Sequence, residues 1–186
     1  EKWLYLKLKL IADIGIIGLP NAGKSSFIKK ISAAKPKIGN YPFTTTSPNL
    51  ANITIDYKEL TFADIPGIIK DAHKGKGLGL NFLSHIERCK IILHLIDSTE
   101  ENIIKNYEII REELSKYGAS LKEKKEILVL TKSDLINEGQ VNKYSKQLKS
   151  YSNKNVIPIS INNLNSLTAI KKLLLSEKNN NKQFDT

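Results

Sequence analysis

The 186-residue chain is 40% hydrophobic and 26% charged, the composition of a soluble globular protein, and its length suits one α/β domain. No apolar run approaches the roughly 20 residues of a membrane span, and no signal sequence opens the chain, so neither a membrane span nor export is expected. A single cysteine, Cys89, excludes an internal disulfide framework and favours the reducing cytoplasm. Because the chain contains no methionine, we expect it to be part of a longer protein.

The formal net charge of the chain is +10. Such a balance favours association with nucleic acid or another polyanion. The alternative is a Lys- and Asn-rich composition spread over solvated faces, since aromatic residues are not interleaved with the lysines as in a base-stacking platform. Charge alone leaves both interpretations open.

Strands and helices are expected to alternate along the chain. Alternating leucines in residues 1–10 predict a strand that enters from a preceding domain, and the apolar run 8–17 predicts the first core strand. A helix over 26–34 should follow, and then a loop over 35–49 whose length makes it functional or disordered. Further strands are expected at 51–55, 60–65, 91–96, 127–130 and 156–161, and further helices at 80–88, 102–117, 141–148 and 164–175.

This alternation predicts an α/β fold with a doubly wound, mostly parallel six-stranded sheet and helices on both faces. The domain should span residues 1–176, with 1–8 as the entry strand and 177–186 as a polar tail. Ligands of such folds bind outside the carboxyl ends of the strands.

Residues 18–25 match the phosphate-binding pattern G-x-x-x-x-G-K-[ST], between a predicted strand and a predicted helix. The glycines let backbone N–H groups surround a polyphosphate, and the helix N-terminus adds its positive dipole end. Lys24 should reach the β- and γ-phosphates, and Ser25 should ligate Mg²⁺. The alternative, a glycine turn with a chance lysine, does not explain the flanking elements. The expected nucleotide-binding residues here are Gly18, Leu19, Pro20, Asn21, Ala22, Gly23, Lys24, Ser25 and Ser26.

Two segments further along the chain extend the phosphate site. Asp64-Ile65-Pro66-Gly67 ends a predicted strand, where the carboxylate can hold Mg²⁺ through water and the Gly67 N–H can meet a γ-phosphate. Thr44-Thr45-Thr46 lies in the long loop, where one threonine can complete the Mg²⁺ shell and release after hydrolysis. Either segment alone is a weak signal, but their occurrence in this order after a phosphate loop makes both specific.

Thr131-Lys132-Ser133-Asp134 fits [NT]-K-x-D and predicts a guanine site. The carboxylate accepts hydrogen bonds from guanine N1–H and the exocyclic amine, whereas adenine presents an acceptor at N1. The aliphatic stem of Lys132 can pack on the base. Ser160-Ile161-Asn162 is expected to add backbone contacts to the guanine oxygen. The alternative, a polar turn with an N-cap aspartate, does not explain the combination of motifs.

These motifs resemble those of the Obg group of translation-factor-class GTPases. The segments that carry the resemblance are 41–45 (Tyr-Pro-Phe-Thr-Thr), 47–50, 63–69, 72–79 and 82–88. The resemblance implies a P-loop NTPase G domain that binds GTP or GDP with Mg²⁺, with Phe43 and Thr44 at the nucleotide and Thr45 as the Mg²⁺ threonine. It also implies a glycine-rich N-terminal domain, a role in large ribosomal subunit assembly through rRNA and ribosomal proteins, and a link to stress signalling.

Four positions depart from the pattern of the group. Thr131 stands where asparagine is commoner, which weakens the expected contact between base loop and phosphate loop. Ile161 replaces a usual alanine and Ser166 a usual glycine, which affects the backbone around the guanine, and Thr46 replaces an apolar residue.

The sequence predicts slow hydrolysis. Ile68 stands where Ras-like GTPases place a water-orienting glutamine, so Lys24, Gly67, Thr45 and Mg²⁺ remain as the catalytic groups. By resemblance, Asn21 is a candidate for holding a K⁺ ion that supplies charge to the transition state; the alternative is that it only shapes the loop. His73, His85 and His94 have no neighbours at metal-ligand spacing, and Cys89 is expected to be packed and inert.

Two functional classes remain open at this point. The first is a GTPase switch that docks on the large ribosomal subunit, and the second is a sensor of GDP, GTP or alarmone with negligible turnover. The related YchF-type ATPases are a weaker third option, because they typically replace the lysine–aspartate signature that Thr131-Lys132-Ser133-Asp134 retains. In each case we expect a monomer.

Overall fold

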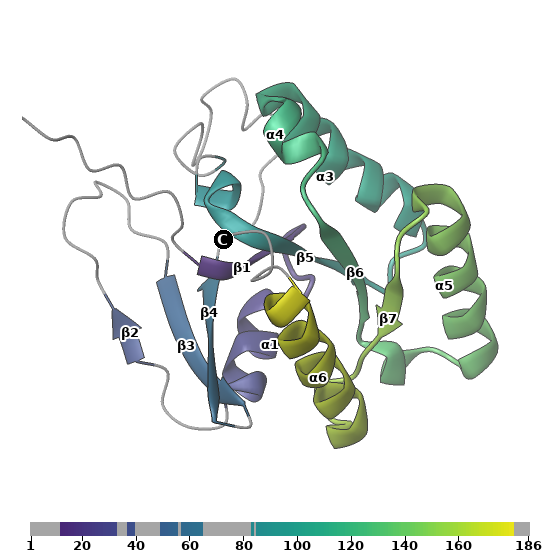
Figure 1. Cartoon of the computed structure of the whole chain (residues 1–186). Coiled ribbons are helices and arrows are strands. Elements are labelled where there is room, and N and C mark those ends of the chain that lie inside the picture. Colours follow the sequence, from purple (N-terminus) through teal and green to yellow (C-terminus); the bar gives the residue numbers. More distant parts are fainter. Residues whose placement is uncertain are drawn as a thin grey trace, which may run out of the picture.

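The computed structural model describes residues 12–32, 37–39, 49–55, 57–64, 83 and 85–180. Its centre is a seven-stranded sheet in the order β2-β3-β4-β1-β5-β6-β7 (Figure 1). The strands are β1 (Ala12–Gly18), β2 (Lys37–Gly39), β3 (Asn49–Ile55), β4 (Lys58–Asp64), β5 (Cys89–Asp97), β6 (Glu126–Thr131) and β7 (Val156–Pro158). The five strands from β4 to β7 in that order run parallel, and β2 and β3 add antiparallel pairs at one edge. The predicted mostly parallel sheet is confirmed.

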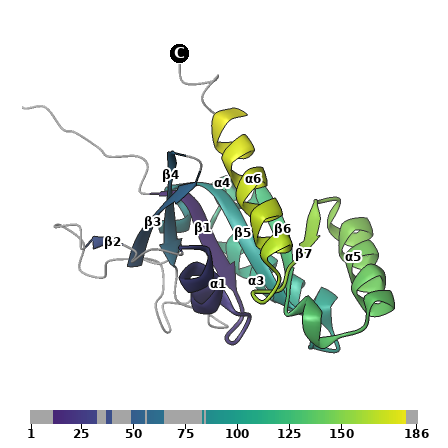
Figure 2. The same ribbon diagram turned by 90° about the horizontal axis from the view of Figure 1, so that it is seen from below.

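Helices cover both faces of this sheet, as predicted. On one face α1 (Lys24–Ile31) and α6 (Leu164–Asn180) lie side by side, and on the other lie α3 (Ile103–Tyr117), α4 (Ala119–Lys122) and α5 (Glu138–Ser152) (Figure 2). Each face has its own buried core: Phe27 and Ile170 pack with Ile14 on the first, and Ile110 and Leu114 pack with Ile92 on the second. The central strands can be apolar nearly throughout because both of their faces are buried.

The structure adds one strand to the six that were predicted. Residues 37–39, inside the expected loop 35–49, form β2 and pair antiparallel with residues 50–52 of β3. A three-residue strand is too short to show a period-two pattern, so the sequence did not indicate it.

Several helix ends also differ from the prediction. Helix α1 begins at Lys24 rather than at 26, and α6 continues to Asn180, so residues 177–180 belong to a helix and not to a tail. Helix α5 is longer than the predicted 141–148 because its ends are capped: the Asn137 side chain accepts a hydrogen bond from the Gln140 backbone N–H at 2.8 Å, and Asn153 ends the helix with a left-handed φ of 54°.

A buried charged cluster joins β5, β6 and α3. Glu126, fully buried at the start of β6, accepts a hydrogen bond from His94 Nδ1 at 2.8 Å and lies 3.4 Å from Arg111 Nη1 and 3.5 Å from Lys154 Nζ. Burial alone raises the pKa of Glu126, but the His94 hydrogen bond and the two cations outweigh it and hold this pKa below its ordinary value. His94 also stacks on Tyr107, so the interpretation of His94 as a packed strand residue is confirmed.

Some predicted elements lie outside the described residues. These are the entry strand at 1–10, most of the loop 35–49 and residues 80–82 and 84 of the helix predicted at 80–88. Within the described part of the chain, no helix is long and apolar enough to span a bilayer.

Candidate functional site

The phosphate loop connects β1 to α1, as predicted from its pattern. Gly23 adopts the left-handed conformation (φ 85°) that turns the chain into α1. The Lys24 ammonium folds back over the loop and donates hydrogen bonds to the Gly18 and Leu19 carbonyls, both at 2.9 Å. The loop therefore holds its lysine charge close to its own backbone.

An open cleft of about 490 Å³ lies at the start of α1, and Lys132 of the [NT]-K-x-D motif borders it. Ser25 and Ser26 are exposed in the first turn of the helix, and Asn21, exposed and in a left-handed conformation (φ 64°), is at the loop. The Ser25 hydroxyl is a hard oxygen donor of the kind that Mg²⁺ prefers. The residues that line the cleft are Asn21, Gly23, Lys24, Ser25, Ser26 and Lys132.

A second pocket of about 220 Å³ adjoins α1 where the predicted guanine motifs meet. Segments that are far apart in the sequence contribute to it: the start of α1, the residues after β6 and the residues after β7. The pocket is lined by Gly23, Ser26, Phe27, Thr131, Lys132, Asp134, Leu135, Ile159, Ile161 and Asn162. Ligand-binding clefts are expected at the carboxyl ends of parallel strands, where this pocket lies.

Thr131 connects the base pocket to the phosphate loop. Its buried hydroxyl lies 3.1 Å from the Ala22 carbonyl and 3.1 Å from the Ile96 carbonyl, and it can donate to either. The contact that was expected to weaken when threonine replaces asparagine is thus present, although a hydroxyl has one proton to share between two acceptors.

Asp97 is a site residue that the sequence analysis missed. It ends β5 in register with Thr131 of β6, and its carboxylate forms an ion pair with the Lys132 ammonium. Its other oxygen accepts hydrogen bonds from the Thr99 backbone N–H at 2.9 Å and the Thr99 hydroxyl at 2.7 Å. Burial raises the pKa of Asp97, but the hydrogen bond and charge of Lys132, together with the two Thr99 hydrogen bonds, outweigh burial and hold this pKa below its ordinary value. The only sequence signal was the position of Asp97 at the end of a buried strand.

Lys132 and Asp134 are presented by a short turn. Lys132 has a left-handed φ of 57°, and a 3₁₀ turn, η2 (Ser133–Leu135), follows it. The Ser133 backbone N–H donates to the Ile159 carbonyl at 3.1 Å, which ties this turn to the segment after β7. Asp134 is exposed, and hydrogen bonds from the side chains of Ser160 and Asn162 hold its pKa below the ordinary value.

The predicted γ-phosphate and switch residues are placed only in part. Asp64 ends β4, beside Ile16 of β1 and Asn49 of β3 in the sheet register, at the same edge as the phosphate loop. The remaining predicted residues of this group lie outside the described part of the chain: Phe43, Thr44, Thr45, Ile65, Pro66 and Gly67. Within the described residues no cluster of three His, Cys, Asp or Glu side chains has metal-site geometry. A Mg²⁺ ion shared between one hydroxyl, one carboxylate and phosphate oxygens does not require such a cluster.

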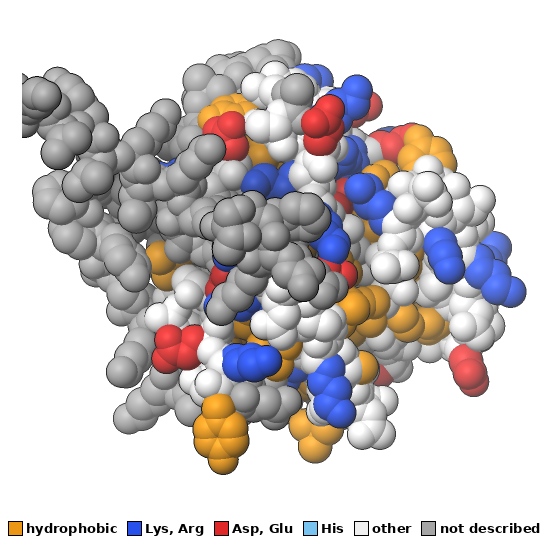
Figure 3. All heavy atoms as spheres, viewed as in Figure 1, with side chains coloured by type: hydrophobic (Ala, Val, Ile, Leu, Met, Phe, Trp, Pro, Cys, Tyr) orange, Lys and Arg blue, Asp and Glu red, His pale blue; other side chains and the backbone are white. Residues whose placement is uncertain are grey.

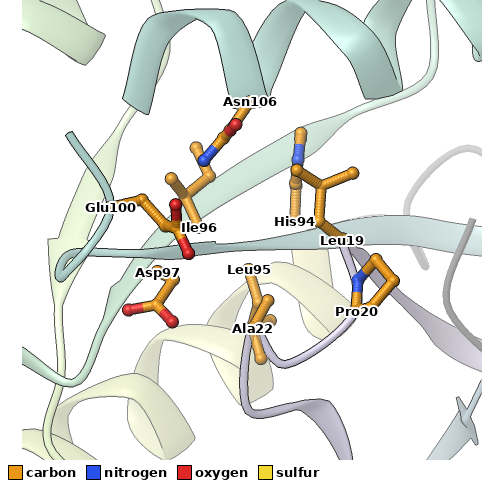
Figure 4. Close-up of a pocket in the computed structure, with 9 residues that line it drawn as sticks. All are labelled: Leu19, Pro20, Ala22, His94, Leu95, Ile96, Asp97, Glu100 and Asn106. Atoms are coloured by element: carbon orange, nitrogen blue, oxygen red, sulfur yellow. The ribbon is translucent and has the colours of Figure 1, made fainter. Parts of the chain in front are cut away.

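A further cavity of about 190 Å³ lies on the α3 side of the phosphate loop (Figure 4). It is bordered by the loop, the end of β5 and α3, and sequence reasoning did not anticipate it. Its lining consists of Leu19, Pro20, Ala22, His94, Leu95, Ile96, Asp97, Glu100 and Asn106. None of the predicted base-binding residues of 131–134 and 160–162 lines this cavity, so it is separate from the base pocket.

A family model described as 50S ribosome-binding GTPase matches residues 13–132. The GTPase Obg of Rickettsia prowazekii (strain Madrid E) is 49% identical over 182 residues, which are 98% of this chain and 55% of that protein. The GTPase Obg of Pelagibacter ubique (strain HTCC1062) is 50% identical over 176 residues, 95% of this chain and 54% of that protein. The chain spans about half the length of these curated relatives.

Solved structures support the same fold. The cytosolic domain of the T. maritima FeoB iron transporter in its GMPPNP form aligns with a TM-score of 0.64 at 18% identity, covering 90% of this chain and 64% of that one. An Aquifex aeolicus Era variant bound to GDP and AlF₄⁻ aligns with a TM-score of 0.60 at 26% identity, covering 87% and 55%. The predicted G-domain architecture is confirmed.

Proposed function

Because this chain belongs to the 50S ribosome-binding GTPase family, as a G domain of the Obg group, we propose that it is a Mg²⁺-dependent switch that binds GTP and GDP and hydrolyses GTP slowly. One observation carries the proposal: the 220 Å³ pocket unites Thr131, Lys132 and Asp134 with the start of α1. A base in this pocket lies beside the phosphate loop, as one nucleotide spanning both sites requires.

At the phosphate end, backbone N–H groups of residues 18–25 and the α1 N-terminus would bind the phosphates. Lys24 supplies the positive charge, and its two hydrogen bonds to loop carbonyls hold it at the site. Ser25, Asp64 and Thr45 are the proposed Mg²⁺ ligands. Bound Mg²⁺ would neutralise charge on the β- and γ-phosphate oxygens.

At the base end, Asp134 would accept the two donors of guanine, and Lys132 would pack its stem along the ring. The Asp97 ion pair fixes the end of the Lys132 side chain. The test is Asp134→Asn in the full-length protein. We expect GDP affinity to fall about 10- to 100-fold, the value of a hydrogen bond to a charged group, and xanthosine diphosphate to become the better ligand. The matched control is Glu138→Gln, which removes a nearby exposed carboxylate that does not line the pocket.

Unchanged GDP affinity in Asp134→Asn, together with competition by ATP in the wild type, would favour the YchF-like ATPase. Preferred binding of guanine nucleotides by the wild type excludes it.

Slow hydrolysis follows from Ile68, which offers no side-chain hydrogen bond to a water. Asn21 lines the cleft together with Lys24 and Ser25, which supports a role in holding K⁺ near the phosphates. We expect GTP turnover to be faster in K⁺ than in Na⁺, and the difference to vanish in Asn21→Ala. Equal rates in the two salts would show that Asn21 only shapes the loop.

We further propose that the intact protein is cytoplasmic and acts on the large ribosomal subunit during its assembly, with a role in the stress response. The net charge of +10 supports contact with rRNA, and basic side chains are spread over the face in Figure 3. On α5, Lys143, Lys146 and Lys149 are exposed. Nucleotide-dependent co-sedimentation of the full-length protein with ribosomal subunits tests this, and failure to co-sediment in any nucleotide state contradicts it.

A nucleotide sensor with negligible turnover is the second candidate, because the sequence offers no glutamine at the catalytic position. Single-turnover GTP hydrolysis with and without large subunits separates the two. The large subunit should stimulate GTP hydrolysis by a switch, whereas a sensor should show no hydrolysis in either condition.

A further inference from the structure

The segment after β7 is organised by the first turn of α6. Asn163 caps this helix: its side-chain oxygen accepts hydrogen bonds from the backbone N–H groups of Asn165 at 2.9 Å and Ser166 at 3.2 Å. The helix therefore begins directly behind Asn162, a residue that lines the base pocket.

Ser166 closes this segment into a ring. Its hydroxyl lies 3.1 Å from the Ser160 carbonyl and 2.8 Å from the Asn163 carbonyl, and the Ser160 backbone N–H donates to it at 3.3 Å. Within the ring, the Asn162 backbone N–H donates to the Ser160 hydroxyl at 3.0 Å. The path of residues 160–163 thus depends on one side chain from the helix behind it.

Asn162 connects the ring to the base-reading carboxylate. Its side-chain amide donates to Asp134 Oδ2 at 3.1 Å. An amide N–H₂ donating to a carboxylate reproduces the pairing that the exocyclic amine of guanine would make with Asp134. Both residues line the same pocket, so a guanine that reaches Asp134 would meet a carboxylate oxygen that already accepts a hydrogen bond.

We propose that Ser166 is a positioning residue for the guanine pocket and that Asn162 is an internal stand-in for the base. Ser166 holds residues 160–163 in the shape that presents their backbone to guanine. Asn162 occupies Asp134 until a nucleotide displaces it. This inference rests on the proposed guanine specificity of the pocket. The two residues consequently act in opposite directions: Ser166 strengthens guanine binding and Asn162 weakens it.

The experiment measures association and dissociation rates of a fluorescent GDP with the full-length protein. For Ser166→Ala we expect the Kd to rise about 2- to 10-fold, the equivalent of one net hydrogen bond, mainly through faster dissociation. Ser166→Thr keeps the hydroxyl and should restore the wild-type Kd. The matched control is Ser176→Ala, because among the described residues the Ser176 hydroxyl bonds only the Leu173 carbonyl of the same helix, at 2.7 Å. The Kd of this variant should not change.

Asn162→Ala should lower the Kd by a similar factor through faster association, because the Asp134 carboxylate then keeps only its Ser160 partner and has one fewer hydrogen bond to exchange. Thermal melts of the nucleotide-free variants identify any that fail to fold. If Ser166→Ala does not fold, the Kd for GDP of Ser166→Thr is compared with that of Ser166→Gly, which lacks the hydroxyl.

Two results would overturn the inference. One is a Ser166→Ala protein that melts lower than wild type but binds GDP as wild type does, which would make Ser166 a helix-capping residue only. The other is weaker GDP binding by Asn162→Ala, which would make its side chain a ligand of the nucleotide. If wild-type protein does not prefer guanine nucleotides, the proposed function fails first and independently of these variants.

Discussion

Gly18 offers a sharp test of how the phosphate loop is built into the sheet. It ends β1 with a φ of 154° and lies in register with Leu95 of β5. A Cβ atom at this position would lie 2.5 Å from the Leu95 carbonyl oxygen and 3.2 Å from the Ala22 Cβ. The oxygen belongs to the backbone of a central strand and cannot turn aside as a flexible side chain would.

Two costs add up in Gly18→Ala. Holding a non-glycine residue in a sparsely populated backbone region costs about 1–3 kcal/mol. Forcing an extra carbon against a packed strand costs about another 1–3 kcal/mol. We therefore expect a loss of about 2–6 kcal/mol in the free energy of unfolding, out of the roughly 5–15 kcal/mol that domains possess.

Chemical denaturation of three glycine variants measures this prediction. In Gly23→Ala the new Cβ meets nothing within 4 Å, so only the left-handed backbone (φ 85°) costs energy, about 1–2 kcal/mol. In Gly139→Ala, within α5, the Cβ meets only Asn137 Oδ1 at 3.4 Å, and a gain of about 0.4–1 kcal/mol is expected. A Gly18→Ala protein as stable as Gly23→Ala would refute the argument, because the contact with β5 would then carry no cost.

Three further predictions concern buried polar groups. Thr131→Val should lower the free energy of unfolding by about 1–3 kcal/mol, since the buried Ala22 and Ile96 carbonyls lose their shared donor; denaturation as in wild type would contradict this. Glu126→Gln should cost about 3 kcal/mol at pH 7, because two partly buried cations lose their partner. Because folding lowers the pKa of Glu126, its contribution to stability is complete at neutral pH and disappears as the pH falls through that lowered pKa. The free energies of unfolding of variant and wild type should therefore converge in acid. A difference that does not depend on pH would count against the ion pairs. Burial raises the pKa of the Cys89 thiol to about 12, so a thiol reagent should label Cys89 at pH 8 only after unfolding, and rapid labelling of the folded protein would show that it is accessible.

Contiguous motifs were the part of the site that could be predicted from the sequence. The phosphate loop and the 131–134 turn each carry their chemistry within a few residues, and burial of both flanking strands makes their position in the sheet predictable. Asp97 escaped detection because its partner Lys132 is far along the chain, and only the register of β5 and β6 brings them together. Glu126 was missed for the same reason, because its partner His94 lies on another strand. In the sequence alone, an acidic residue before an apolar run indicates a solvated strand end.

The two hydroxyl substitutions show why matching a motif says little about how well the site is held. By resemblance, Thr131 and Ser166 stand in place of asparagine and glycine. On sequence grounds the first departure predicted a weaker contact between base loop and phosphate loop, and the second a change in the backbone around the guanine. In the structure each hydroxyl instead contacts backbone carbonyls of the segments that form the pocket. The Thr131 hydroxyl contacts the Ala22 carbonyl, and the Ser166 hydroxyl contacts the carbonyls of Ser160 and Asn163. A motif records the residue type at a position, whereas the strength of the contact depends on which acceptor the fold places opposite. The glycine that Ser166 replaces has no side chain with which to make such contacts, so the pocket of this chain has a support that the usual pattern lacks.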